Sequence, residues 1–215
     1  MQTRWLVMQL ADSAFPVGGF AHSSGLEAAM QSGWARDRRS IEAFCVECVR
    51  QAGALSLPFV RAAHGDGDRL VELDARIDAM LSNAVANRAS RVQGRAHLET
   101  CARVFGDRID LAPTSTMKTH HAPIFGATLA VLEIDEEECA RLFLHATMRG
   151  VTSAAVRLGA MGPSESQRLH VSLHDVLEDV LARSHADVDR AAQISPLADL
   201  LQGAHDRLYS RLFQS

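Results

Sequence analysis

The chain has 215 residues, of which 22 are basic and 26 acidic, so its formal net charge is −4. A negative net charge argues against a nucleic-acid partner bound through phosphate neutralisation. No apolar run approaches the roughly 18 residues that span a bilayer, and the N-terminus lacks the apolar region of a signal peptide. We therefore expect a cytoplasmic protein with no membrane and no nucleic-acid partner, in which one domain buries a hydrophobic core.

The first predicted elements surround a glycine-rich break. An apolar helical segment cannot continue through Phe15, because the proline that follows disfavours helical angles there. Gly18 and Gly19 permit backbone angles that bulkier residues avoid. A hydroxyl of Ser23 or Ser24 can then cap a second, short helix. The run predicts a tight turn between two helices, with no catalytic group of its own.

Helical periodicity recurs along the rest of the chain, and strand patterns hardly appear. Ser40 is the predicted N-cap of the third helix, and Pro58 interrupts that helix. The next apolar stripe indicates one long helix, or two joined near Asn83 or Asn87. Acidic residues after Asp135 favour a helix start. The predicted helices cover residues 3–11, 24–33, 40–52, 70–98, 123–132, 135–158, 163–181 and 196–213, with a long loop over 106–122. These elements predict an all-α, single-domain bundle of roughly eight to ten helices over residues 1–215.

The motifs of common catalytic sites are missing from the sequence. It contains no phosphate-binding GxxxxGK[ST] loop, no GxSxG nucleophile elbow and no HExxH zinc motif. Cys45 and Cys48 form a CxxC pair without a second pair, within a helical pattern, which favours buried free thiols over a metal or redox site. We expect neither catalytic activity nor a bound cofactor or resident metal.

Histidine and arginine spacings leave alternatives open. His170 and His174 are spaced to share a helix face, and His120 and His121 are adjacent, yet neither pair has an obvious third metal ligand. A metal site built from these histidines is one alternative. The basic face formed by residues 88, 91 and 95 is either solvated or a contact for a partner.

The last residues of the chain are unusually rich in apolar and arginine side chains. Chain ends usually fray, and a fraying end would gain little from Tyr209, Leu212 and Phe213. Aromatic and arginine residues are enriched at interface hot spots. The segment 204–215 therefore docks either on the core of this chain or, as a docking helix, into a partner.

Four motifs in register resemble the urease accessory protein F family. They are Phe-Pro-Val-Gly-Gly-Phe at 15–20 with Ser-Gly-Leu-Glu at 24–27, His-His-Ala-Pro-Ile-Phe-Gly at 120–126, Ser-Ala-Ala-Val-Arg-Leu-Gly at 153–159, and Leu-Tyr-Ser-Arg-Leu-Phe at 208–213. The resemblance covers essentially the whole chain. The versions Phe-Ala-His-Ser at 20–23 and His-His-Ala-Pro at 120–123 look closer to plant-type members than to many bacterial ones. Ala21-His22 departs from the Tyr-Ser or Phe-Ser of many bacterial members.

The resemblance implies an all-helical, dimeric, non-enzymatic factor for urease maturation. Such a protein links accessory protein D (H in some bacteria) to the nickel-carrying GTPase G and regulates its GTP-dependent nickel delivery to apo-urease. The nucleotide and the nickel then belong to the complex. The 204–215 segment would contact protein D, and the glycine turn with Glu27 would lie near the GTPase and the dimer surface. The candidate partner-binding residues are Gly18, Gly19, Glu27, Arg88, Arg91, His205, Tyr209, Arg211, Leu212 and Phe213.

Two other functions remain as alternatives. One is a nickel-binding protein that uses His120, His121, His170 or His174 as ligands. The other is a helical hydrolase, which the missing nucleophile motifs disfavour.

Overall fold

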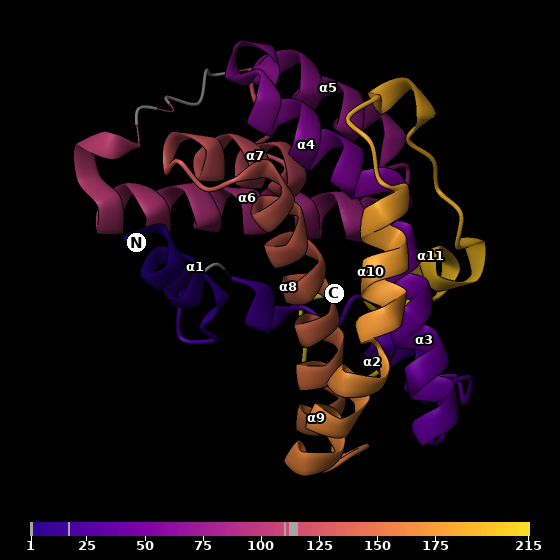
Figure 1. Ribbon diagram of the computed structural model, residues 1–215. Helices are drawn as coiled ribbons and strands as arrows, with labels where there is room; N and C mark the ends of the chain where they lie inside the picture. Colours follow the sequence, from indigo (N-terminus) through magenta and orange to yellow (C-terminus); the bar gives the residue numbers. More distant parts are fainter. Residues whose placement is uncertain (1, 17, 110, 112–115) are drawn as a thin grey trace.

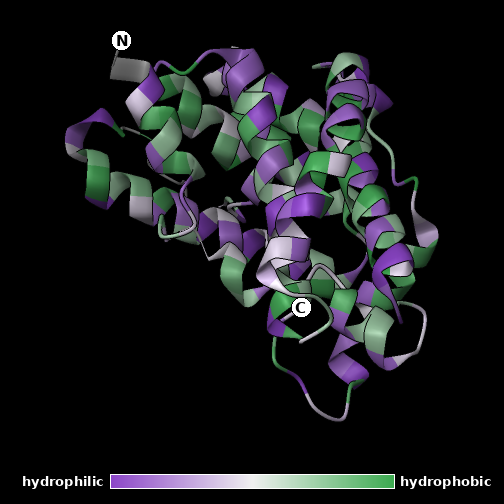
Figure 2. Ribbon diagram, turned by 60° about the horizontal axis from the view of Figure 1, so that its bottom comes forward, coloured by the Kyte–Doolittle hydropathy of each residue, from purple (hydrophilic) through white to green (hydrophobic). Residues whose placement is uncertain are grey.

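The computed structural model describes residues 2–16, 18–109, 111 and 116–215 (Figure 1). All regular elements within these residues are helical, and none of them is a strand. The prediction of an all-α, single-domain protein is confirmed. Hydrophobic and hydrophilic residues alternate in short stretches along the helices (Figure 2), as expected for helices that turn one face to a shared core. The α-helices are α1 (Gln2–Ala11), α2 (Leu26–Gln31), α3 (Arg38–Gln51), α4 (Leu57–Gly65), α5 (Leu70–Met80), α6 (Ala84–Phe105), α7 (His121–Val131), α8 (Glu136–Arg157), α9 (Pro163–Ser172), α10 (His174–Arg183) and α11 (Pro196–Gly203).

Helix α7 forms the centre of the core. Every residue from Ala122 to Leu129 is buried, and the helix packs against both α4 and α6. Two glycines allow the backbones to approach this closely. A Cβ at Gly126 would lie 2.1 Å from the carbonyl oxygen of Val60 in α4, and a Cβ at Gly94 of α6 would lie 2.0 Å from the carbonyl oxygen of Thr119. No larger residue fits at either position without moving backbone.

Helices α3 and α4 join through a π-helical segment, Ala52–Ser56, into one continuous helix over residues 38–65. Pro58 does not interrupt the helix as predicted, because the π-helical segment before it replaces the regular hydrogen bonds at the point where its N–H is missing. In the wider π turn the carbonyl of Ala54 accepts a hydrogen bond from the N–H of Ala192 (3.1 Å). Among the described residues, this helix alone is long and apolar enough to cross a membrane, and 50% of its most apolar window is buried inside the protein, as in a core helix.

Several helix boundaries refine the prediction. Asp37, not Ser40, is the N-cap of α3; its carboxylate accepts from the N–H of Ser40 at 2.9 Å, and the two residues form a capping box. Asn83 caps α6, so the apolar stripe divides into two helices there. Asp135 caps α8 as expected. The helix predicted over residues 163–181 breaks at Leu173 into α9 and α10.

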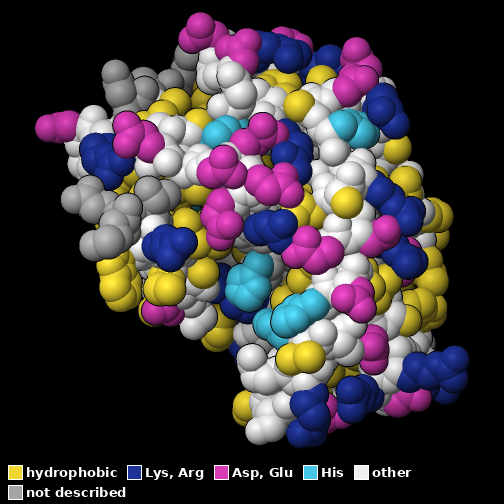
Figure 3. All heavy atoms as spheres, in the orientation of Figure 1, with side chains coloured by type: hydrophobic (Ala, Val, Ile, Leu, Met, Phe, Trp, Pro, Cys, Tyr) yellow, Lys and Arg dark blue, Asp and Glu magenta, His cyan; other side chains and the backbone are white. Residues whose placement is uncertain are grey.

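The predicted loop over residues 106–122 is shorter than expected. Gly106–Arg108 forms a 3₁₀ turn, and α7 starts at His121 instead of Pro123. Residues 110 and 112–115 lie outside the described residues. Cys45 and Cys48 are free thiols, as predicted, and so are Cys101 and Cys139; burial raises the pKa of Cys45 to about 12. On the face shown in Figure 3, acidic and basic side chains are interspersed, with histidines among them.

The C-terminal segment differs most from its prediction. The last helix was expected to continue to Phe213, but α11 ends at Gly203 and is followed only by a 3₁₀ turn, η6 (Ala204–Arg207). Leu208 is extended, with φ −66° and ψ 137°. The N–H groups of Leu212 and Phe213 find an acceptor outside the helix, in a side chain of α2, so extending the helix is not needed to satisfy them.

Candidate partner-binding site

The turn between α1 and α2 contains the two adjacent glycines. Gly18 has a left-handed backbone (φ 76°) and precedes a 3₁₀ turn, η1 (Gly19–Ala21). A Cβ at Gly18 would lie 3.2 Å from the Cβ of Ala96 in α6, whereas a Cβ at Gly19 would meet nothing within 4 Å. The predicted turn is confirmed, and glycine is required at Gly18 only. Val17 lies outside the described residues.

The N-cap of helix α2 lies one residue after Ser24 and two after Ser23. This N-cap is Gly25, with φ 88°, so neither serine occupies the N-cap position. The predicted hydroxyl contact is nevertheless present, because Ser23 Oγ accepts the N–H of Glu27 in the first turn of α2 (3.4 Å). A Cβ at Gly25 would lie 2.9 Å from the Cα of Gln202 in α11. The start of α2 and the end of α11 thus pack backbone against backbone.

Glu27 of α2 anchors the C-terminal residues. It is 3% exposed, and its carboxylate accepts backbone N–H groups of Leu212 (2.7 Å) and Phe213 (3.1 Å). The Nε2 of buried His205 lies 3.2 Å from the same carboxylate. A buried carboxylate is costly unless it is hydrogen-bonded, and here three donors surround it. Residues far apart in the sequence are therefore locked together by one side chain.

The end of the chain continues along the turn. The N–H of Gln214 donates to the carbonyl of Ala21 (2.8 Å), and both the N–H and the hydroxyl of Ser23 donate to the carbonyl of Ser215 (2.6 and 2.8 Å). Nδ1 of His22 lies 2.7 Å from the hydroxyl of Ser215. We call residues 208–215 the C-terminal strap. The segment docks on its own chain, which was one of the two alternatives expected from the sequence.

Arg157, at the C-terminal end of α8, lies between two phenylalanine rings. Its guanidinium carbon is 3.7 Å from the ring centroid of Phe20 and 4.3 Å from that of Phe213. The guanidinium also donates to the carbonyl of Phe20. Cation–π contacts with both rings link the glycine turn, α8 and the strap. Nothing in the arginine's own spacing signals this contact, although it lies in the 153–159 motif.

Arginines at the rim add exposed ion pairs. Arg88 of α6 donates to both carboxylate oxygens of Asp206 (2.8 and 3.0 Å), and Arg211 reaches the same residue at 3.3 Å. Pairs this exposed contribute little to stability. Arg91 lies exposed further along α6, where its charge helps to lower the pKa of Asp78. The structure therefore brings every candidate residue except Arg91 to one region.

Burial divides these candidates into two groups. Glu27, His205 and Phe213 are buried within this chain, so they hold the strap in place. Tyr209 is fully exposed and Leu212 is 54% exposed, and Arg211 lies at the surface beside them. Phe20 of the turn is 69% exposed. The exposed group presents the aromatic, arginine and aliphatic side chains that interfaces use.

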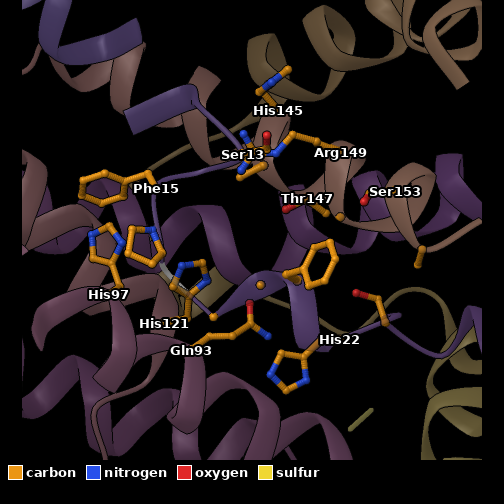
Figure 4. Close-up of a pocket in the computed structure, with 18 of the residues that line it drawn as sticks. Ser13, Phe15, His22, Gln93, His97, His121, His145, Thr147, Arg149 and Ser153 are labelled. Atoms are coloured by element: carbon orange, nitrogen blue, oxygen red, sulfur yellow. The ribbon is translucent and has the colours of Figure 1, made fainter. Parts of the chain in front are cut away.

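A cavity of about 220 Å³ lies behind the turn, between α1, α6, α7 and α8, and Phe213 of the strap forms part of its wall (Figure 4). Four histidines (His22, His97, His121 and His145) line it together with Phe15 and other apolar residues. Burial lowers the pKa of His22 to about 4, of His97 to about 3 and of His121 to about 4. The cavity is thus lined by neutral imidazoles at neutral pH.

The histidines proposed as metal ligands are occupied by other contacts. His120 bonds Ser90 through Nδ1 (3.0 Å) and Asp78 through Nε2 (2.9 Å). His170 bonds the hydroxyl of Thr152 at 2.7 Å, while His174 begins the next helix, so the two do not share one helix face as predicted. His121 packs among aromatic rings. Within the described part of the chain, no group of three or more His, Cys, Asp or Glu residues is arranged to hold a metal ion.

Comparison with known proteins places these features in a family. The family model described as UreF matches residues 35–174. The chain is 40% identical to urease accessory protein F of Oryza sativa subsp. indica over 222 aligned residues, covering 97% of this chain and 84% of the rice protein. It is 37% identical to the Arabidopsis thaliana protein of the same name (99% and 92% covered) and 31% identical to urease accessory protein UreF of Mycobacterium sp. (strain JLS), with both chains fully covered.

Proposed function

This chain belongs to the urease accessory protein F family and so has its role in urease maturation, and we propose that within it the chain is a scaffold that joins two other accessory proteins. One partner is accessory protein D (or H), and the other is the nickel-carrying GTPase G. In this proposal the chain regulates GTP-dependent delivery of nickel to apo-urease, is itself no catalyst, holds no nucleotide or resident metal, and works as a cytoplasmic homodimer.

The observation that carries the proposal is the strap. Its buried residues fix it to α2, while Tyr209, Arg211 and Leu212 stay at the surface on a segment with no regular structure of its own. Exposed anchors on a segment held by a few hydrogen bonds can be taken up by a partner without unfolding the helical core. We assign this surface to the contact with protein D.

The sharpest test replaces an exposed anchor and leaves the buried contacts intact. We expect Leu212→Asp to weaken co-purification with protein D at least tenfold, with unchanged helical circular dichroism, because its side chain does not hold the strap. Val171→Asp is the matched control, since Val171 is 67% exposed on α9 and the substitution is chemically the same. Deleting residues 204–215 should abolish capture. Undiminished capture by both strap variants would refute this assignment.

The glycine turn is the proposed contact for the GTPase. Phe20 is largely exposed. A Cβ added to its neighbour Gly19 would meet nothing within 4 Å in this chain. Phe20→Ala and Gly19→Val should therefore reduce capture of the GTPase and urease activation while the fold stays stable. Capture and activation equal to the wild type in both variants would leave the turn with a structural role only.

A nickel-binding role is the second candidate, favoured only by the histidine spacing in the sequence. Equilibrium dialysis of the isolated chain with nickel separates the two proposals. Tight stoichiometric binding that His120→Ala or His170→Ala removes would support this role. The scaffold proposal predicts no such binding by the chain alone.

A further inference from the structure

We propose that the C-terminal strap is an acid-sensitive latch, in which protonation of His22 frees residues 208–215 from the body of the protein. His22 lies directly beneath the end of the strap. It is 5% exposed, and its Nδ1 lies 2.7 Å from the hydroxyl of Ser215. The neighbouring contacts, from Ser23 to Ser215 and from Gln214 to Ala21, close the strap over the imidazole.

The docked position accepts only a neutral imidazole. When Nδ1 carries the proton and donates to Ser215, Nε2 is an acceptor. This Nε2 is buried and has no hydrogen-bond partner among the described residues. A second proton would place a charged N–H donor at the same point, with nothing to receive it. The docked strap and a charged His22 are therefore incompatible without rearrangement.

The positive charges around His22 also disfavour its protonation. Burial, His205 and Arg88 together lower the pKa of His22 to about 4. The carboxylate of Glu27 is already surrounded by the three donors that hold the strap, and the main-chain oxygen of Ser215 already accepts the N–H and the hydroxyl of Ser23. The titratable and charged groups around His22 are Arg88 of α6, His121 of α7, Glu27 of α2, Arg157 of α8 and His205 of η6.

Release of the strap exposes His22 to water, where its pKa returns towards the ordinary 6.5. The released form then binds a proton more readily than the docked form, so acid shifts the equilibrium towards release. With these two values, lowering the pH from about 7 to about 5 favours release by roughly 20-fold. Within the described part of the chain, the hydrogen bond of the His22 side chain runs to Ser215 and its Nε2 has no partner, so loss of this contact acts on the strap.

Amide hydrogen exchange on the intact chain tests the latch. The N–H groups of Leu212 and Phe213, which donate to Glu27, report docking. After correction for the intrinsic pH dependence of exchange, their protection should fall about 20-fold between about pH 7 and about pH 5. Amides of α7 report global opening and should stay far better protected throughout. Protection of Leu212 and Phe213 that does not change with pH would overturn the proposal.

Two variants separate His22 from other titrating groups. His22→Gln keeps a hydrogen-bonding side chain without a titratable group, so the strap's protection should become nearly independent of pH over this range. His64→Gln is the control, because His64 bonds the carbonyl of Ile134 (2.8 Å), away from the strap, and should keep the wild-type response. An equal acid response in His22→Gln would also refute the latch.

The link from release to partner capture rests on the proposed function, but release itself is measured on the chain alone. If exchange shows the latch and protein D is captured equally at both pH values, the scaffold assignment of the strap fails and the latch stands. If capture depends on Leu212 while exchange is independent of pH, the latch fails and the scaffold stands.

Discussion

Glu27 and Phe213 are 186 positions apart in the chain, and the carboxylate of the first accepts the backbone N–H of the second at 3.1 Å. The same carboxylate holds Leu212 and faces His205. The carboxylate of Glu27 thus accepts backbone N–H groups of the strap that would otherwise bond to carbonyls within a helix.

Replacing Glu27 should free the strap. Glu27→Ala removes the acceptor of two backbone N–H groups and leaves His205 buried without its partner, a loss of roughly 1–3 kcal/mol. Urea denaturation should show this loss, and limited proteolysis should cut first within residues 208–215. Glu99→Ala, at an exposed position of α6, is the control and should change stability by less than about 0.5 kcal/mol. Equal stability of the two variants would contradict the anchoring role.

Arg157→Lys should loosen the contact between the turn and the strap. Lysine keeps the charge but loses the planar guanidinium that lies 3.7 Å and 4.3 Å from the two ring centroids. We expect a loss of about 0.5–1 kcal/mol and faster hydrogen exchange at Phe213, with α7 unaffected. A lysine variant with the stability and exchange of the wild type would show that charge alone is sufficient there.

Glycine substitutions should separate packing from helix propensity. Gly126→Ala places a Cβ 2.1 Å from the carbonyl oxygen of Val60, and we expect destabilisation of about 3 kcal/mol or more. Gly150→Ala, within α8, meets nothing within 4 Å and should stabilise the protein by about 0.5–1 kcal/mol. Thermal unfolding of the two variants checks both signs, and a stable Gly126→Ala protein would mean that α4 and α7 can move apart.

Global stability should fall as the pH drops below about 6.5. The pKa values of His22, His97 and His121 are lowered to about 4, 3 and 4, so the unfolded chain binds protons before the folded one does. Each group therefore costs stability as the pH falls from its ordinary value towards its folded value, at up to about 1.4 kcal/mol per pH unit. Urea denaturation at about pH 7 and about pH 5 measures the slope. His97→Gln should remove one histidine's share of it, and an unchanged slope would mean that His97 does not titrate this way.

Local signals predicted much of this fold. The Asp135 cap and the apolar stripes of α6 and α8 depend on neighbours in sequence, which is why their positions were close to those found. The cap of α3 was misplaced because Ser40 is the second member of a capping box whose first member is Asp37. The π-helical segment between α3 and α4 has no distinct local signature, so Pro58 was taken as a break.

The sequence singled out residues that meet in this region but did not show how they meet. Glu27 and Phe213 were each selected as partner contacts, and both are buried against one another instead of facing solvent. No local pattern tells that an acidic residue of α2 will accept N–H groups from the far end of the chain. The same holds for Arg157, whose two aromatic partners come from opposite ends of the sequence. Only tertiary packing decides these contacts.

The π-helical turn at residues 52–56 absorbs one residue without changing which side of α4 faces the core. A π turn holds about one residue more than an α turn within the same full rotation. Deleting one residue from this segment should therefore restore regular α-helical hydrogen bonds and leave Val60 facing Gly126. What such a deletion would change is the wider turn itself, where the carbonyl of Ala54 accepts the N–H of Ala192.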